Sequence, residues 1–238
     1  MPRPIVFIFA AVAIFSAIIA LDYFDLELLS STLELSVVPL ITFLYFIIGK
    51  NRQLYLAFFF VLYTIGDVIN ILDFNAESSW SYYVCNFSYT MAYLFLVLHI
   101  TKGLSFKLVL KKYRLDFIVL LILAMYMVYV LIDIINPINF ESNFIEVVQF
   151  VEFLYSLMLI TVLSFSFLNY LQNSDNKNLL LFTACVLIAF SELVLIGYYY
   201  LVDDIRISYA SSVLFVSGMF VLFFHTFLEV SIKKERKA

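Results

Sequence analysis

Apolar residues run along the chain in eight long stretches that are separated by short polar segments. A helix needs about 20 mainly apolar residues to cross roughly 30 Å of hydrocarbon, and each stretch comes close to that length. The runs are continuously apolar and do not alternate every second residue, so they predict helices. The predicted spans, to within a few residues, are 4–21, 33–49, 54–72, 82–100, 115–135, 144–171, 178–201 and 209–230. The sequence therefore predicts an all-α fold, a polytopic transmembrane helix bundle of eight spans that forms one integral membrane domain over residues 1–238.

Composition supports a membrane protein and excludes several other classes. Hydrophobic residues make up 64% of the chain and charged residues 13%, against roughly 45–50% and 25% in soluble domains, so the chain lacks the charge that a wet surface needs. The 14 basic and 18 acidic residues leave no cationic face for nucleic acid. Two cysteines and two histidines are too few for a structural zinc cluster. We therefore expect membrane lipid as the partner, and we expect no nucleic acid, no metal and no cofactor.

Basic residues fall almost entirely on one side of the predicted bundle. Of the 14 Lys and Arg residues, all but Arg206 lie at the two termini or in alternate loops. By the positive-inside rule, this distribution predicts that both termini are cytoplasmic. The short loops and the lack of a usable glycosylation sequon favour a bacterial inner membrane. Residues 1–20 also allow a second interpretation, a signal peptide, whose cleavage would leave seven spans in the same orientation.

Polar side chains within the spans are the candidates for function, because an ionisable group in hydrocarbon costs at least about 2.5 kcal/mol on insertion scales. Three acids, three amides and two histidines share this setting: Asp67, Glu152, Glu192, Asn70, Asn86, Gln149, His99 and His225. From a rise of 1.5 Å per residue, Asp67 and Glu192 lie roughly 20 Å from the inner ends of their helices, and Glu152 lies roughly 12 Å from the outer end of its helix. The three carboxyls are thus predicted to share one layer of the outer leaflet, with no Lys or Arg at that depth.

Carboxyl groups at one depth allow three interpretations. Burial in hydrocarbon favours the neutral form of a carboxyl, and neighbouring carboxyls share protons, which suits general acid–base catalysis on a neutral substrate. The same groups would equally suit a proton relay in a transporter. In the third interpretation, each acid only forms hydrogen bonds with Tyr or Asn across helices. Spacings of i, i+3 predict that Asn70 lies beside Asp67 and that Gln149 lies beside Glu152.

Other conspicuous side chains are expected to be structural. We expect His225 to form an interhelical hydrogen bond rather than to bind a ligand. Cys85 and Cys185 lie at different depths, beyond the reach of a disulfide, and are expected to be buried apolar residues. Aromatic residues near the outer ends of the spans are expected to form an interfacial belt: Trp80, Tyr82, Tyr83, Tyr198, Tyr199 and Tyr200.

Four short motifs follow one another along the chain in a characteristic order. They are Val38-Pro39-Leu40 on the second stretch, Gly66-Asp67 on the third, Phe95-Leu96-Val97-Leu98-His99 on the fourth, and Ser191-Glu192 on the seventh. Because these motifs occur in this order, the chain resembles a divergent member of the YhhN family of eight-span membrane proteins, whose characterised animal members are lysoplasmalogenases. The resemblance covers the span count, the orientation and roughly residues 36–100, with a weaker match at 183–196. Three positions differ from the family pattern: Val38 replaces Lys, Glu192 replaces Asp, and Lys102 replaces Tyr.

The resemblance implies hydrolysis of the vinyl ether bond of lysoplasmalogen-type lipids, giving an aldehyde and a glycerophospho head group. Asp67 and Glu192 would then be the catalytic acid and base, or an electrostatic pair. The remaining candidates would support them or bind the substrate: Asn70, Asn86, His99, Gln149, Glu152 and Ser191. The competing interpretations are a proton-coupled transporter or lipid-binding bundle without chemistry, and a structural or regulatory membrane partner in which the acids only hold helices together.

Overall fold

The computed structural model describes residues 4–24, 26–48, 53–73, 79–135, 145–201 and 204–235. These residues form helices and no strand. The helices are α1 Pro4–Tyr23, α2 Glu27–Leu35, α3 Val37–Ile48, α4 Leu54–Asp73, α5 Ser79–Thr101, α6 Phe106–Lys112, α7 Arg114–Ile135, α8 Ile145–Gln172, α9 Asn176–Tyr200 and α10 Ile205–Glu235.

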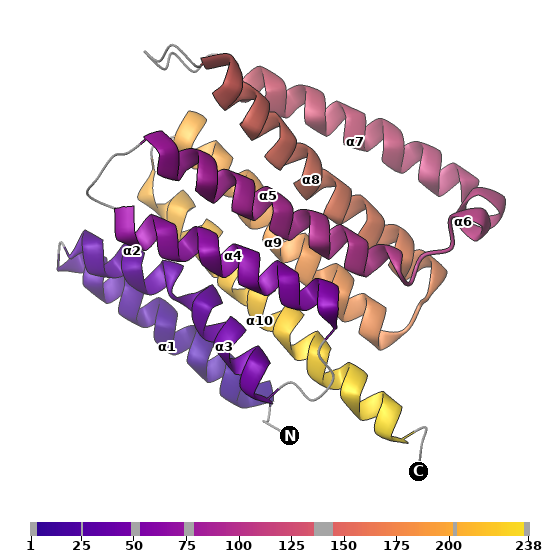
Figure 1. Cartoon of the computed structure of the whole chain (residues 1–238), viewed down its shortest axis with the longest axis horizontal. Helices are drawn as coiled ribbons and strands as arrows, with labels where there is room; N and C mark the ends of the chain where they lie inside the picture. Colours follow the sequence, from indigo (N-terminus) through magenta and orange to yellow (C-terminus); the bar gives the residue numbers. More distant parts are fainter. Residues whose placement is uncertain are drawn as a thin grey trace.

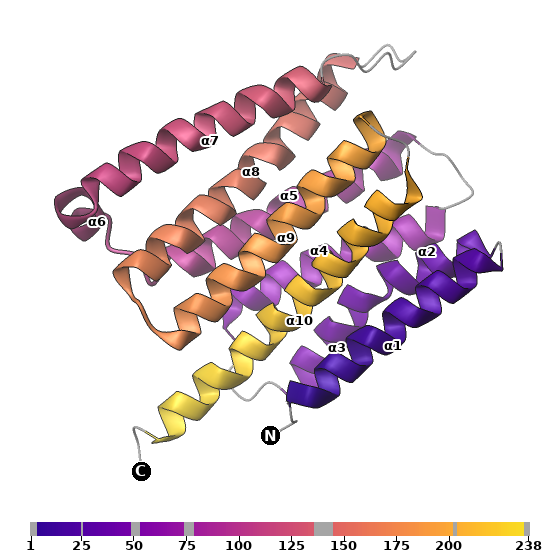
Figure 2. The ribbon, with the colours of Figure 1, turned by 180° about the vertical axis from the view of Figure 1, so that it is seen from behind.

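The long helices lie side by side along one direction, as the all-α bundle prediction requires (Figure 1). Helices α4 and α5 cover one face of the bundle and α9 and α10 cover the opposite face, which Figure 2 shows from behind. The most extensive packing joins α9 to α10, α4 to α5 and α5 to α8. Helices α1, α2 and α3 form one edge of the bundle, and α7 forms the other.

Seven helical segments in the described part of the chain are long and apolar enough to cross a membrane. They are Leu28–Ile48, Leu54–Asp73, Trp80–Thr101, Arg114–Ile134, Val147–Gln172, Asn176–Tyr200 and Ile205–Phe227. In α1, the shorter segment Val12–Tyr23 is apolar, and α1 packs against α2 and α10. The membrane-helix architecture therefore agrees with the sequence, while an eighth crossing by α1 stays a prediction.

The first helix begins and the last helix ends at the same end of the bundle (Figure 1). The short helix α6, which contains Lys107, Lys111 and Lys112, lies at this end too. Other basic residues used for the orientation lie outside the described residues: Arg3, Lys50, Arg52, Arg236 and Lys237. The cytoplasmic location of this end stays a prediction from the positive-inside rule.

The second span begins earlier than predicted and is divided into two helices. The expected bounds were 33–49, whereas the apolar segment is Leu28–Ile48 and α2 gives way to α3 at Ser36. Pro39 explains the break, because proline has no N–H to donate to the carbonyl of Leu35 one turn earlier. Glu34, the second residue of the predicted span, therefore lies six residues inside the apolar segment.

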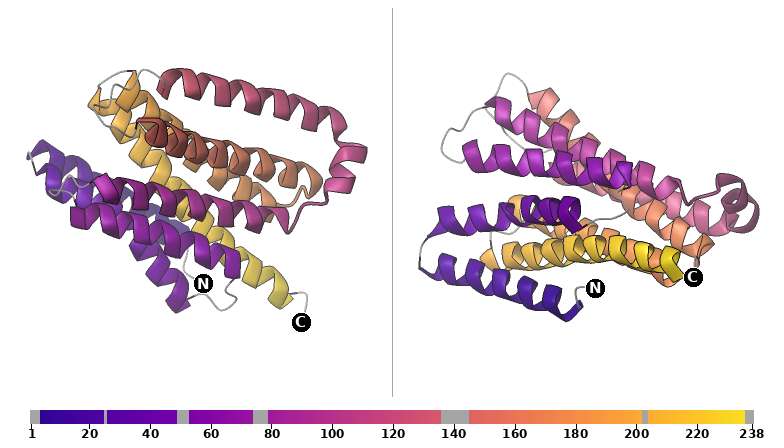
Figure 3. Two further views of the ribbon diagram at one scale, coloured as in Figure 1. Left: turned by 45° about the horizontal axis from the view of Figure 1, so that its top comes forward. Right: turned by 60° about the horizontal axis from the view of Figure 1, so that its bottom comes forward.

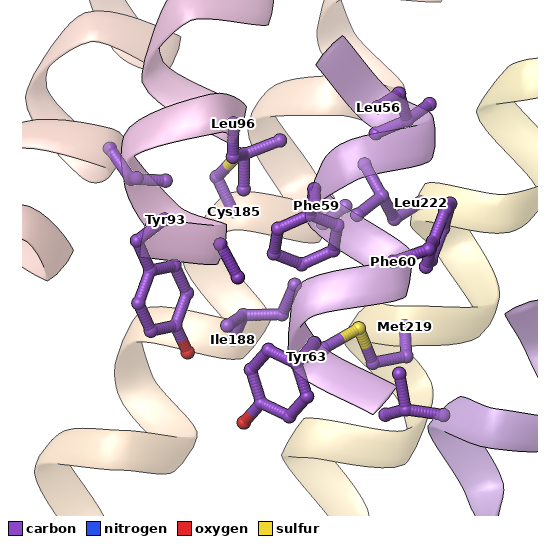
Figure 4. Packing of buried hydrophobic residues seen from close by; sticks show 14 of the residues in the cluster. Leu56, Phe59, Phe60, Tyr63, Tyr93, Leu96, Cys185, Ile188, Met219 and Leu222 are labelled. Atoms are coloured by element: carbon purple, nitrogen blue, oxygen red, sulfur yellow. The ribbon is translucent and has the colours of Figure 1, made fainter. Parts of the chain in front are cut away.

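Aromatic and aliphatic side chains from α4, α5, α9 and α10 form the core (Figure 4). On α4 the buried residues Leu56, Phe59, Phe60 and Tyr63 recur at helical spacing and define the face that turns inward. Asp67 lies one turn beyond Tyr63 on this same buried face. The Asp67 carboxyl therefore lies inside the bundle, on the same face of α4 as the apolar core residues.

Helices α9 and α10 approach each other closely because small residues line their contact. The Ser191 and Ser211 hydroxyls each donate to the backbone carbonyl of the other residue, at 2.9 and 3.0 Å. A Cβ atom at Gly218 would lie only 2.8 Å from Cγ1 of Ile188 and 3.0 Å from its backbone nitrogen. Small residues at such crossings are typical of membrane helices, whose association depends on close backbone approach.

Helix α7 stands at the edge of the bundle, as Figures 1 and 3 show. It packs mainly against α8, and very few of the residues of Arg114–Ile134 are buried. Large apolar side chains on α7, such as Val119, Met125 and Tyr129, are more than half exposed. In a membrane this surface faces lipid.

Candidate functional site

The carboxyl group of Glu192 on α9 is held by phenols from three other helices. Its Oε1 atom accepts hydrogen bonds from the hydroxyls of Tyr63 on α4, at 3.3 Å, and Tyr93 on α5, at 3.0 Å. The hydroxyl of Tyr155 on α8 interacts with the same carboxyl. In Figure 4 the hydroxyls of Tyr63 and Tyr93 lie on the same side of the core, beyond Ile188. Glu192 is 8% exposed, so this carboxyl is in the interior of the bundle.

Asp67 on α4 has one carboxyl oxygen bonded and one without a partner. Its Oδ1 accepts a hydrogen bond from the Tyr89 hydroxyl at 2.9 Å, and that hydroxyl accepts one from Nδ2 of Asn70 at 3.0 Å. Oδ2 is buried and has no hydrogen-bond partner among the described residues. Buried polar atoms are nearly always paired, so an unpaired carboxyl oxygen is a candidate contact for a ligand or a reacting group.

The glycine before Asp67 explains how Tyr89 reaches it. A Cβ atom at position 66 would lie 2.4 Å from Cε1 of the Tyr89 ring, so only glycine allows the ring to lie across α4 at this point. The ring of Tyr63 lies 4.7 Å from the same ring, centroid to centroid. Tyr63 and Tyr89 therefore form a continuous aromatic contact between the Glu192 carboxyl and the Asp67 carboxyl.

Two further carboxyls on neighbouring helices accept hydrogen bonds from hydroxyls. Oε1 of Glu152 on α8 accepts from Tyr82 on α5, and Oε1 of Glu34 on α2 accepts from Ser212 on α10. Asp67 interacts electrostatically with both Glu34 and Glu192, and Glu192 interacts with Glu152. The four residues Glu34, Asp67, Glu192 and Glu152, named here the carboxyl cluster, form a row across the bundle.

The carboxyl cluster lies at one level of the membrane. Glu34 and Glu152 are each seven residues from the first residues of α2 and α8, while Asp67 and Glu192 are six and eight residues from the last residues of α4 and α9. At 1.5 Å per residue these positions are about 9–12 Å from helix ends on the same side of the bundle. The row therefore runs parallel to the membrane plane and does not extend across the bilayer.

Chemically, the carboxyl cluster is a set of carboxyl groups that each accept a hydrogen bond from at least one hydroxyl. A phenol or a serine hydroxyl can donate to a carboxylate and can also accept from a protonated carboxyl. Interacting carboxyls bind and release protons as a group rather than singly. In the described residues, no group of three or more His, Cys, Asp or Glu side chains is arranged to hold a metal ion. The arrangement can hold, donate and accept protons at a bond placed beside Asp67 or Glu192.

Three predicted companions lie outside the carboxyl cluster. Asn86 donates to the backbone carbonyl of Tyr82 on its own helix. Ser191 bonds to Ser211 at the α9–α10 crossing, one residue before Glu192. Gln149 lines a cavity between α7 and α8. Of the four amide and serine companions, Asn70 alone is joined to a cluster carboxyl in the described hydrogen bonds, through Tyr89.

Both histidines lie toward the opposite ends of their helices from the carboxyl cluster. His99 is in the last turn of α5, and its ring lies 6.1 Å from the ring of His225 on α10, centroid to centroid. The prediction of a hydrogen bond for His225 is wrong within the described residues, because both ring nitrogens are buried without a partner. Its ring packs against the His99 ring instead.

Two expectations about side chains near the site have opposite outcomes. Cys85 and Cys185 are both buried and free, which confirms that they form no disulfide. The assignment of Tyr82 to the interfacial belt alone is wrong, because its hydroxyl donates to Glu152. A tyrosine near a helix end has a long enough side chain to direct its hydroxyl either to the interface or inward.

Sequence reasoning missed one acid and most of the phenols. Glu34 lies close to the predicted start of the second span, where an acid resembles a loop residue. The tyrosines that hold the carboxyls are Tyr63, Tyr89, Tyr93 and Tyr155. Tyr63 lies four residues before Asp67 and Tyr155 three residues after Glu152, so a search for tyrosines at helical spacing around the acids would have found these two. Tyr89 and Tyr93 lie on α5, which contains no acid, so that search would have missed them.

Two positions that differ from the YhhN pattern are structurally accommodated. Val38 is 1% exposed and belongs to the apolar core, where a lysine would bring a charge. The ammonium group of Lys102 lies 4.0 Å from the centroid of the Tyr55 ring, at the far end of α5 from the carboxyl cluster.

No family model, no curated protein and no solved structure matches the chain.

Proposed function

We propose that the carboxyl cluster is an acid–base centre that hydrolyses the vinyl ether bond of lysoplasmalogen-type lipids. The observation that carries the proposal is the juxtaposition of two buried carboxyls with different surroundings. Asp67 has a buried oxygen without a partner in the described residues, and Glu192 is held by phenols. The similarity of Gly66-Asp67 and Ser191-Glu192 to the YhhN pattern supports the same reaction.

The depth of the carboxyl cluster supports a lipid linkage as the substrate bond. Helix α8 has 28 residues, and at 1.5 Å per residue its length of about 42 Å equals that of a whole bilayer with its head groups. Glu152 is seven residues from the start of α8, so it lies about 4 Å inside the hydrocarbon boundary if α8 is centred in the bilayer. The bonds that join glycerol to its chains lie near this boundary.

Enol ether hydrolysis needs an acid, an anion and one water molecule. Protonated Asp67 gives its proton to the distal carbon of the C=C bond, which produces an oxocarbenium ion. Ionised Glu192 stabilises this cation and then takes a proton from the water that adds to the carbon next to oxygen. The resulting hemiacetal divides into an aldehyde and a glycerol hydroxyl as its O–H proton passes to the departing oxygen. Transfer of the proton from Glu192 back to Asp67 completes the cycle.

The surrounding hydroxyls have separate tasks in this scheme. Tyr63 and Tyr93 favour the ionised form of Glu192 by donating to it, as charge-assisted hydrogen bonds do. Tyr89 fixes the orientation of Asp67 through Oδ1, which leaves Oδ2 as the proton-bearing atom. Asn70 orients the Tyr89 hydroxyl by donating to it.

The test is aldehyde release from lysoplasmalogen by purified protein in detergent. We expect Asp67→Asn and Glu192→Gln each to lower the rate by about 10²–10⁴-fold, the usual contribution of a general acid or base. Asp133→Asn on α7 makes the same chemical change at an exposed position, and we expect it to leave the rate unchanged. Circular dichroism and elution volume verify that each variant is folded.

The other results would exclude the proposal in different ways. Full activity in both Asp67→Asn and Glu192→Gln would show that the carboxyl cluster is not the acid–base centre. Absence of aldehyde release by the folded wild-type protein, in detergent and in lipid vesicles, would exclude the hydrolase. A proton flux into vesicles that depends on Asp67 would then favour the carrier.

A further inference from the structure

Two cavities lie along the seam between α7 and α8. A cavity with a volume of about 240 Å3 lies near the start of α8, and a second one of about 50 Å3 follows deeper along the same seam. The first is lined by Val128, Leu131, Ile132, Gln149, Phe150, Phe153 and Ser156, and the second by Leu120, Leu123, Ala124, Met127, Leu159, Ile160, Leu163, Ser164, Ala189 and Leu193. We name the two together the α7–α8 groove.

Two polar side chains lie in the upper cavity, whose other lining residues are apolar. Gln149 lies near the start of α8, and Ser156 lies two turns deeper. Ser156 is 2% exposed, and its hydroxyl has no hydrogen-bond partner in the described residues. A buried hydroxyl without a partner costs free energy unless an occupant supplies an acceptor. No charged residue lines the described groove, so an uncharged oxygen suits this position.

The groove is next to the carboxyl cluster, because two of its lining residues directly follow residues of the Glu192 site in sequence. Leu193, which lines the deeper cavity, follows Glu192 directly on α9. Tyr155, whose hydroxyl interacts with Glu192, precedes Ser156 on α8. An occupant of the groove therefore lies against the other side of the residues that hold Glu192.

We propose that the α7–α8 groove binds the hydrocarbon chain of a membrane lipid, with an uncharged oxygen of that lipid at Ser156. This lipid is distinct from a substrate whose reacting bond lies beside Asp67, so its binding is independent of the proposed function. From Ser156 to Ser164 the groove continues along eight residues of α8, or about 12 Å, which leaves room for the part of the chain next to that oxygen. Lipid is the occupant because the lining is apolar and the exposed side chains of α7 beside it face the bilayer.

Photolabelling tests the groove without requiring hydrolysis. The probe is a lysophospholipid whose chain is saturated, ether-linked and labelled with a diazirine near its middle, incorporated into phosphatidylcholine vesicles with the protein. Since this probe has no vinyl bond, its binding is independent of turnover. We expect adducts on the lining residues of α7 and α8, and we expect unlabelled lysophospholipid to compete for them.

Variants that fill the groove distinguish specific binding from contact with bulk lipid. Ser156→Phe and Ala124→Phe place a ring in the upper and the lower cavity, and we expect each to lower labelling of the seam at least about fivefold, equivalent to about 1 kcal/mol. Met125→Phe, on an exposed side of α7, is the matched control and should leave the labelling unchanged. If either filling variant fails to fold, the other still gives the result.

Each remaining outcome overturns one of the two proposals. Adducts spread evenly around α7, including Tyr126 and Tyr129, or labelling unaffected by both folded filling variants, would overturn the groove. Seam labelling without aldehyde release would leave the groove in place and overturn the hydrolase. Aldehyde release that depends on Asp67, without seam labelling, would leave the hydrolase in place and overturn the groove.

Discussion

Removal of one hydroxyl from Tyr89 tests how Asp67 is held. The phenol donates to Asp67 at 2.9 Å and accepts from Asn70 at 3.0 Å, so Tyr89→Phe breaks two hydrogen bonds and keeps the ring that contacts Tyr63. Side-chain hydrogen bonds between membrane helices contribute about 0.6 kcal/mol on average and up to about 1.7. Asp67 would also be left with both oxygens unpaired in the described structure, which costs about 1–3 kcal/mol. We expect the free energy of unfolding to fall by about 1–3 kcal/mol.

A double-mutant cycle isolates the contact between the two side chains. The free energy of unfolding is measured for wild type, Tyr89→Phe, Asp67→Leu and the double variant by titration with dodecyl sulfate in mixed micelles. We expect a coupling energy of at least about 0.6 kcal/mol. Tyr129→Phe makes the same change on an exposed part of α7 and should alter stability by less than about 0.5 kcal/mol. Additivity of the two substitutions within about 0.3–0.5 kcal/mol would refute the hydrogen bond.

Two further predictions concern packing and pH. Gly218→Ala places a Cβ atom within 3.0 Å of Ile188 and should lower thermal stability by about 1–3 kcal/mol, whereas Gly197→Ala meets nothing within 4 Å and should be neutral or stabilising; equal effects would contradict the close α9–α10 contact. Hydrogen bonds from Arg206 lower the pKa of Asp204 below its ordinary value of 3.8, so this pair stabilises the fold above that pH and its contribution is lost as the pH falls through the lowered pKa. Denaturant titrations should therefore find Asp204→Asn slightly less stable than wild type at pH 7 and equal to it well below pH 3.8, and a difference that persists in acid would contradict the pairing.

The helical type and the approximate ends of seven membrane segments could be predicted because each depends on local sequence, while the eighth crossing, by α1, stays a prediction. A continuous apolar run of about 20 residues allows little other than a membrane helix. The common level of Asp67, Glu152 and Glu192 follows from counting residues along each helix, because the rise per residue is constant. In the structure these three acids are connected by electrostatic interactions of Glu192 with Asp67 and with Glu152.

The rotation of each helix could not be predicted. Membrane helices are apolar on most sides, so they lack the amphipathic stripe that indicates the inward face of a helix in a soluble protein. Gln149 and Glu152 are only three residues apart, yet the first lines the α7–α8 groove and the second bonds to Tyr82. Neighbouring helices also decide whether a buried side chain finds a partner, and His225 finds none for its nitrogens in the described chain.

The site of protonation is the most direct test of the central claim that the carboxyl cluster delivers a proton to an enol ether carbon. Lysoplasmalogen is hydrolysed by the wild-type protein in deuterium oxide, and the released aldehyde is trapped at once and weighed by mass spectrometry. We expect one deuterium on the carbon next to the aldehyde group, and we expect Asp67→Asn and Glu192→Gln to lower the rate of labelled product by about 10²–10⁴-fold. An aldehyde without deuterium, or labelled aldehyde formed equally fast by both variants, would contradict protonation of carbon by this cluster.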